Sequence, residues 1–102
     1  MNNRDDPSYS SEDFEPLLSQ SFVIGDGTGT LEATLVEVTN LREAQGAGRR
    51  SRQFSLVWRG PPAAVLPQKI YSVTHPVLGT VEVFLVTIGS DAEGTRYEAV
   101  FT

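Results

Sequence analysis

Apolar and polar residues alternate along most of the chain after residue 20. The clearest example is QFSLVWRG, in which Phe54, Leu56 and Trp58 share one face of an extended segment. A period of two is typical of β-strands that bury one side. The same period predicts six strands, at residues 21–24, 31–41, 53–60, 69–75, 80–88 and 96–102.

The stretch before residue 21 has a different pattern, with polar residues ahead of a small apolar group. Ser10 or Ser11 can cap the start of a helix. Glu12 and Asp13 then lie in the first turn, where carboxylates favour the helix dipole. Pro16 restricts this helix to one or two turns. We expect it to turn three apolar side chains toward the body of the protein: Phe14, Leu17 and Leu18.

The long second strand changes phase in its middle. Leu31, Ala33 and Leu35 alternate with polar residues, and the apolar positions then shift to Val36 and Val38. A β-bulge near Leu35 and Val36 restores a single inward face, so we expect strong bending there.

Turn signals separate the strands. Residues 25–29, GDGTG, predict a hairpin turn, and so do residues 90–94, SDAEG. The segment HPVLG predicts a type I turn with Pro76 in second place and Gly79 in a left-handed conformation. Sequential hairpins imply an antiparallel sheet. The predicted fold class is therefore all-β with one short N-terminal helix, as a small antiparallel β-barrel or sandwich of about six strands. We expect one β domain over residues 11–102, preceded by a flexible N-terminal arm at residues 1–10.

The sequence closes on RYEAVFT, a strand pattern with Tyr97, Ala99 and Phe101 in phase. An open edge strand invites aggregation, and proteins often blunt one with lysine or proline, neither of which is present here. The favoured interpretation is that this strand pairs within the molecule, beside residues 81–88, and helps to close the sheet. The alternative is an edge that pairs with another subunit or a partner.

Composition narrows the class of protein further. The 102 residues carry a formal net charge of −5 and a pI near 4.7, which disfavours binding to nucleic acid. Without cysteine, a disulfide framework and a cysteine-based metal site are excluded. No apolar run approaches the roughly 20 residues that span a bilayer, and the first residues lack a signal-peptide pattern. We expect a soluble, cytoplasmic protein with no membrane partner.

Four segments carry a family resemblance: DFEPLLSQSF, FSLVWRGP, LPQKIYSVTHPVLGTVEVFLVTIG and YEAVFT. Together they resemble a family of small bacterial domains of unknown function. Its pattern reads F-S-L-x-F-R-G-P, L-P-Q-x-x-Y-x-x-x-H-P-x-L-G, F-L-V-P-I-G and a closing Y-E-A-V-F-N. The resemblance covers about residues 13–102 and implies no established activity. Members are often encoded near phage-tail-collar or tail-fibre-like proteins, which implies a structural or assembly role.

Three positions depart from the family pattern. Trp58 stands where phenylalanine is usual, which changes the side-chain volume. Thr87 replaces the usual proline and predicts a more regular strand around residues 84–88. Thr102 replaces the usual asparagine, which argues against a role for a terminal amide.

Residues that could carry chemistry also have structural explanations. The glycines of residues 25–29 superficially resemble a phosphate loop, but a strand follows where a phosphate loop requires a helix. His75 is the only histidine and has no second histidine or cysteine to act with. A hydrogen bond that fixes the turn is therefore favoured for His75 over proton transfer.

Carboxylates give no clearer signal of catalysis. Glycosidases use a pair of carboxylates. The glutamates of the predicted strands, however, alternate with apolar residues, as solvated outer positions do: Glu32, Glu37, Glu82 and Glu98. The sequence also lacks a nucleophile–base motif. We therefore expect no enzyme activity, no cofactor and no metal.

Two loops offer candidate contacts. Arg49, Arg50 and Arg52 form a basic cluster, either a solvated loop or a docking site for an acidic partner surface. Gln68 is either a buried amide that fixes its loop or part of an exposed contact. In the second case the loop at residues 60–67, with Pro61 and Pro62, belongs to the same contact.

Four aromatic side chains are either core residues, the favoured interpretation, or a ligand-binding face: Trp58, Tyr71, Phe84 and Tyr97. The leading functional hypothesis is a non-enzymatic structural or assembly module that partners a phage-tail-fibre-like bacterial protein, with incorporation in an extracellular tail-like assembly. Contact would be through strand edges and loops, with a protein partner or by self-association. The alternative is a small ligand- or carbohydrate-binding β-barrel. The candidate contact residues are Arg49, Arg50, Arg52, Trp58, Pro61, Pro62, Gln68, Tyr71, His75 and Tyr97.

Overall fold

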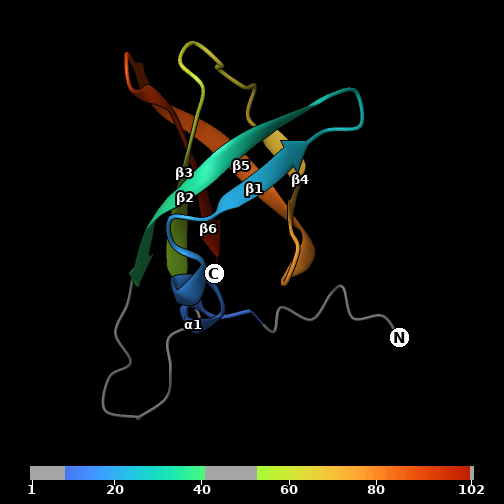
Figure 1. Ribbon diagram of the computed structural model, residues 1–102, viewed down its shortest axis with the longest axis vertical. Helices are drawn as coiled ribbons and strands as arrows, with labels where there is room; N and C mark the ends of the chain where they lie inside the picture. The colour runs from blue at the N-terminus through green and yellow to red at the C-terminus, as the bar shows by residue number, and fades with distance from the viewer. Residues whose placement is uncertain (1–8, 41–52, 102) are drawn as a thin grey trace.

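The computed structural model describes residues 9–40 and 53–101 (Figure 1). Most of the predicted N-terminal arm, up to residue 8, lies outside this part of the chain. The elements in chain order are α1 (Ser11–Phe14), η2 (Glu15–Leu17), β1 (Ser21–Gly25), β2 (Thr30–Asn40), β3 (Phe54–Gly60), β4 (Lys69–His75), β5 (Gly79–Asp91) and β6 (Gly94–Phe101).

The six strands form a closed antiparallel barrel in the order β1-β2-β3-β6-β5-β4. This order confirms the all-β prediction and selects a barrel over a sandwich. Closure depends on two pairings between strands that are not consecutive in the sequence: β1 with β4, and β3 with β6. Those two pairings turn the hairpins into one enclosed core.

The terminal strand has neighbours on both sides, which confirms that it pairs within the molecule. Its main neighbour is β3, paired from Gly60 opposite Thr95 to Phe54 opposite Phe101. Its pairing with β5 begins only where Val86 lies opposite Glu98. The predicted position beside residues 81–88 therefore holds for the second half of that segment, because the first half of β5 pairs with β4 alone.

Two register shifts bend the barrel. Leu35 lies opposite Trp58 and Glu37 lies opposite Val57, so Val36 is the extra residue of a bulge where the phase slip predicted one. A second shift falls between Thr87 and Gly89. The prediction that Thr87 makes this part of β5 more regular is therefore wrong.

The short helical segment lies at the lower end of the barrel (Figure 1). The backbone N–H of Ser10 donates to Asp13 Oδ2 at 2.8 Å, which confirms that the helix is capped here. The Phe14 ring is buried, with its centroid 5.9 Å from that of Phe54 and 5.8 Å from that of Phe101.

Leu17 is also buried, as predicted, but Leu18 is exposed. The prediction for Leu18 fails because the chain leaves the helix there, and Ser19 has a positive φ of 73° that turns it toward β1.

Candidate functional site

The loop between β3 and β4, residues 61–68, is held in place by hydroxyl groups. Tyr97 Oη donates to Ala64 O at 2.6 Å, and Tyr71 Oη donates to Pro67 O at 2.6 Å. Thr87 Oγ1 accepts from Leu66 N–H at 3.1 Å and donates to Leu66 O at 3.0 Å. These contacts come from β4, β5 and β6, so the β3–β4 loop is fixed to the barrel rather than free.

The first residues of the loop are fixed by Thr95, whose side chain is fully buried. Its Oγ1 donates to Pro61 O at 2.8 Å and accepts from Ala64 N–H at 3.2 Å. Sequence reasoning missed Thr87 and Thr95. Both threonines lie at inward-facing positions of strands whose other inward-facing residues are apolar, and this pattern could have indicated them.

Gln68 is exposed, which rules out the first of its two alternatives, a buried amide that fixes this loop. The hydroxyl groups take that role because they reach the loop carbonyls from within the barrel. Pro61 and Pro62 are exposed as well and remain available for contact. The arginines of the predicted basic cluster, Arg49, Arg50 and Arg52, lie outside the described residues.

Three of the four aromatic candidates belong to the core. Trp58, Tyr71 and Tyr97 are buried, which confirms core packing for them, and burial raises the pKa of the Tyr97 hydroxyl. Trp58 meets Phe22 edge-on, with centroids 5.6 Å apart. The core assignment is wrong for Phe84, which is 53% exposed on the outside of β5.

His75 is buried and uses both ring nitrogens. Its Nδ1 accepts from the backbone N–H of Val77 at 3.0 Å and from that of Leu78 at 3.4 Å. Its Nε2 lies 2.7 Å from Gln20 Oε1. The hydrogen bond that was predicted to fix the turn is confirmed.

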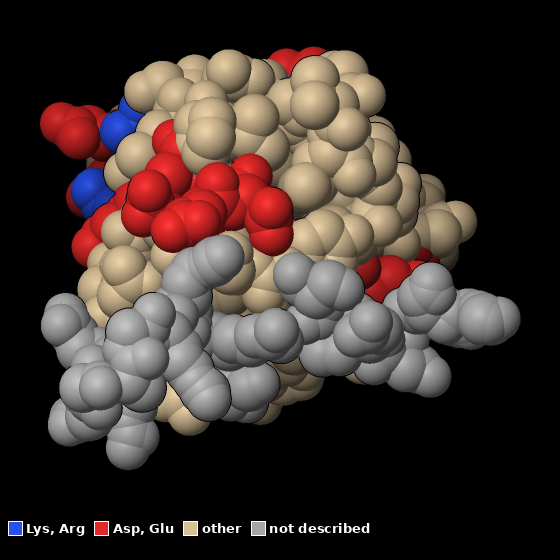
Figure 2. Space-filling view, turned by 90° about the horizontal axis from the view of Figure 1, so that it is seen from below, with Lys and Arg blue, Asp and Glu red and all other residues tan. Residues whose placement is uncertain are grey.

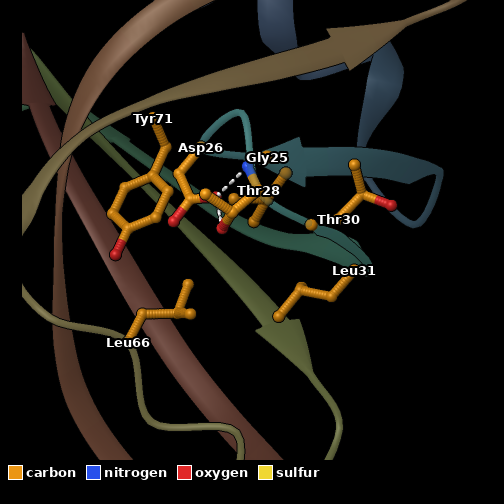
Figure 3. A pocket seen from close by; sticks show the side chains of 9 residues that line it. Gly25, Asp26, Thr28, Thr30, Leu31, Leu66 and Tyr71 are labelled. Atoms are coloured by element: carbon orange, nitrogen blue, oxygen red, sulfur yellow. Dashed lines mark hydrogen bonds between the residues drawn. The ribbon is translucent and has the colours of Figure 1, made fainter.

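A pocket of about 240 Å³ opens between the β1–β2 hairpin and the β3–β4 loop (Figure 3). The segment at residues 25–29 forms a hairpin, as predicted. The lining combines aliphatic and aromatic groups with polar ones: Ile24, Gly25, Asp26, Thr28, Gly29, Thr30, Leu31, Leu66 and Tyr71. Figure 3 shows the Asp26 carboxylate and the Thr28 hydroxyl close to the Tyr71 ring, above Leu66 and Leu31.

The Asp26 carboxylate is the charged group of this pocket. Its Oδ1 accepts from Thr28 N–H at 2.9 Å and from Thr28 Oγ1 at 2.7 Å, and Lys69 Nζ lies 3.2 Å from its Oδ2. The hydrogen bonds from Thr28, followed by the contact with Lys69, hold the pKa of Asp26 far below its ordinary value. Asp26 is therefore an anion that is already neutralised by a neighbouring cation.

The outside of β4, β5 and β6 carries exposed apolar side chains. Ile70 on β4 lies directly opposite Phe84 on β5, and these residues are 61% and 53% exposed. On the other side of β5, Val86 lies opposite Glu98. Two residues further along β6 comes Val100, which is also 53% exposed. We call Ile70, Phe84 and Val100 the outer apolar row.

Carboxylates gather at the end of the molecule that carries α1 and η2 (Figures 1 and 2). Glu12, Asp13 and Glu15 on these elements are exposed. Glu32, Glu37 and Glu82 are exposed on the strands, as expected for outer positions, whereas Glu98 is half-buried. In the part of the chain that the structure describes, no group of three or more His, Cys, Asp or Glu residues is arranged to hold a metal ion.

The fold defines a class of protein: a small closed antiparallel barrel. It has a helical segment at one end and a loop fixed by hydrogen bonds at the other. Residues 9–101 match the family described as domain of unknown function (DUF6916), and the chain belongs to that family. No curated protein and no solved structure showed significant similarity to the chain. Within residues 9–40 and 53–101, no helix is long and apolar enough to cross a membrane.

Proposed function

We propose that this chain is a non-enzymatic interaction module that assembles with a protein of a phage-tail-fibre-like bacterial system. The outer apolar row is the observation that carries the proposal. Ile70 and Phe84 form a cross-strand pair on the outside of the barrel, where neither supports the core. Val100 is exposed on the outside of β6 as well, and exposed apolar groups that are not needed by the core are a feature of protein-binding surfaces.

Other groups support a binding role rather than catalysis. Both ring nitrogens of His75 are used within the fold, so it has no free atom for proton transfer. The carboxylates at the α1 end would repel a phosphate backbone, which favours a protein over a nucleic acid at that face. The exposed Pro61, Pro62 and Gln68 extend the surface available to a partner.

The test is co-purification from the native bacterium with the intact chain as bait. We expect the wild-type protein to retain a tail-fibre-type partner, and the double variant Ile70→Thr, Phe84→Ser to lose it. Val77→Thr is the matched control, because Val77 is an exposed apolar residue in the β4–β5 turn. A wild-type monomer without such a partner, or a partner retained by a folded double variant, contradicts the proposal.

A second candidate function is the binding of a small ligand or carbohydrate. Two of the three rings first assigned to it, Trp58 and Tyr97, are buried and are not among the residues that line the pocket. The pocket beside Asp26 favours this function instead, with Tyr71 as one wall.

A further inference from the structure

We propose that the pocket between the β1–β2 hairpin and the β3–β4 loop binds a small, neutral, polyhydroxylated ligand such as a single pyranose ring. The outer apolar row plays no part in this site. The inference rests on the second candidate function, ligand binding by this pocket, and is independent of a protein partner.

The size of the pocket limits the ligand to one small ring. Its volume is about 240 Å³, slightly below the roughly 300–1,000 Å³ of pockets that take drug-sized molecules. The mouth of a β-barrel is also one of the places where such sites recur.

The walls of the pocket are already fixed without a ligand. Leu66 is held by two hydrogen bonds to Thr87, and Tyr71 is tied to Pro67. Asp26 is held by the backbone and the hydroxyl of Thr28. A preorganised site loses little conformational freedom on binding, so even a small ligand retains affinity.

The charges of the pocket favour a neutral ligand. Asp26 lines the pocket, and Lys69, which is not one of the lining residues, pairs with it at 3.2 Å, so the Asp26–Lys69 pair has no net charge. A charged ligand must compete with one partner of this pair. A hydroxyl group can donate to the Asp26 carboxylate and accept from the Lys69 ammonium, because a carboxylate only accepts and an ammonium only donates. Adjacent hydroxyls on a ring therefore match the pair without breaking it.

The apolar walls of the pocket match the apolar C–H groups of a sugar ring. Ile24, Leu31 and Leu66 are aliphatic and line the pocket beside the polar edge. They suit the C–H face of a pyranose, while the hydroxyls of the ring face Asp26 and Thr28. An inorganic ion or a hydrocarbon would satisfy only one of these two surfaces.

The test is a ¹H–¹⁵N NMR titration of the full chain with neutral pyranoses: glucose, galactose, mannose and N-acetylglucosamine. We expect at least one to shift the amides of residues 25–31 and of Leu66, with a dissociation constant in the millimolar range. Glucosamine and glucuronate are the charged counterparts, and each should bind at least tenfold more weakly. The inference is overturned if no neutral pyranose shifts these amides, or if a charged counterpart binds as tightly.

Two variants and a matched control test the polar edge. Asp26→Asn and Lys69→Gln should each weaken binding at least tenfold. Asp91→Asn is the control, because Asp91 accepts from Glu93 N–H at 2.9 Å and pairs with Arg96 at 3.5 Å in another hairpin, away from the pocket. It should leave binding unchanged. Lys69 is exposed and outside the turn, so Lys69→Gln keeps the test valid if Asp26→Asn disturbs folding. Equal affinity of Lys69→Gln and wild type overturns the inference.

Discussion

The Nε2 atom of His75 lies 2.7 Å from Oε1 of Gln20, and so connects the end of β4 to the segment that precedes β1. Because Nδ1 accepts from Val77 N–H, the ring proton is on Nε2 and is donated to Gln20. The backbone carbonyl of Gln20 in turn accepts from Leu35 N–H at 3.0 Å. One neutral imidazole thus joins the β4–β5 turn, the start of β1 and, through Gln20, β2.

We expect His75→Ala to lower the free energy of unfolding by about 2 kcal/mol, because it leaves the turn amides and the Gln20 side chain without their partner. Gln20→Ala removes only one of these bonds and should lower it by about 1 kcal/mol. Urea denaturation measures both changes. A His75→Ala variant as stable as the wild type would show that the turn forms without the imidazole.

Thr95→Val should destabilise the protein by about 1–3 kcal/mol although the two side chains have nearly the same shape. The substitution leaves Pro61 O and Ala64 N–H without the hydroxyl that serves both. Amide hydrogen exchange should become faster at Ala64. Thr80→Val is the matched control, since the Thr80 hydroxyl is exposed and lies 3.0 Å from that of Thr74, and its effect should stay within about 0.5 kcal/mol.

Gly94→Ala should be among the most damaging single substitutions, at more than about 2 kcal/mol. Gly94 has a φ of 145°, and a Cβ atom there would lie 2.5 Å from Gly60 O and 2.7 Å from Arg59 Cγ. Gly89→Ala is the comparison, because a Cβ atom at Gly89 meets nothing within 4 Å. Thermal unfolding of the two variants should differ clearly, and similar melting temperatures would contradict the predicted clash.

Trp58→Phe should change the free energy of unfolding by less than about 1 kcal/mol. Trp58 Nε1 is buried without a hydrogen-bond partner among the described residues, so phenylalanine removes an unsatisfied donor while it leaves a small void. Trp58→Ala should cost about 3–5 kcal/mol. If the phenylalanine variant is as unstable as the alanine variant, the prediction is wrong, and the indole itself rather than side-chain volume decides stability at this position.

Asp26→Asn should destabilise the protein at neutral pH and lose that effect in acid. The pKa of Asp26 in the folded protein lies below the ordinary value of 3.8, so its carboxylate stabilises the fold above about pH 4. That contribution disappears as the pH falls through the lower, folded-state pKa. The stability difference between wild type and variant, measured by urea denaturation from pH 7 to pH 2, should therefore narrow below pH 4. A difference independent of pH would assign the effect to turn geometry instead of charge.

Local features of this fold could be predicted from the sequence because they depend on neighbouring residues. The alternation around Trp58 predicted a strand, and the phase slip at Val36 predicted a bulge, since a strand that keeps one face inward must absorb an extra residue. Gly79 has the positive φ that its turn requires. Each of these is determined within a few residues of chain.

The candidate site could not be predicted in the same way. Phe84, Leu85 and Val86 are apolar in both phases, and this run favoured a buried Phe84, although Phe84 shares the outward phase of Glu82 and is exposed in the barrel. The pocket depends on Leu66 and Thr87 meeting across the barrel mouth, far from Asp26 in the sequence.

The sequence by itself determined the strands, their turns and the inward faces of most of them, because a period of two and special backbone angles are local properties. The tertiary structure alone decided that β1 pairs with β4 and β3 with β6, that hydroxyls pin the β3–β4 loop, and that Asp26 faces Lys69. Those contacts join segments far apart along the chain, and many such pairings satisfy the same alternation. Only the requirement that every strand find two neighbours around one shared core selects among them.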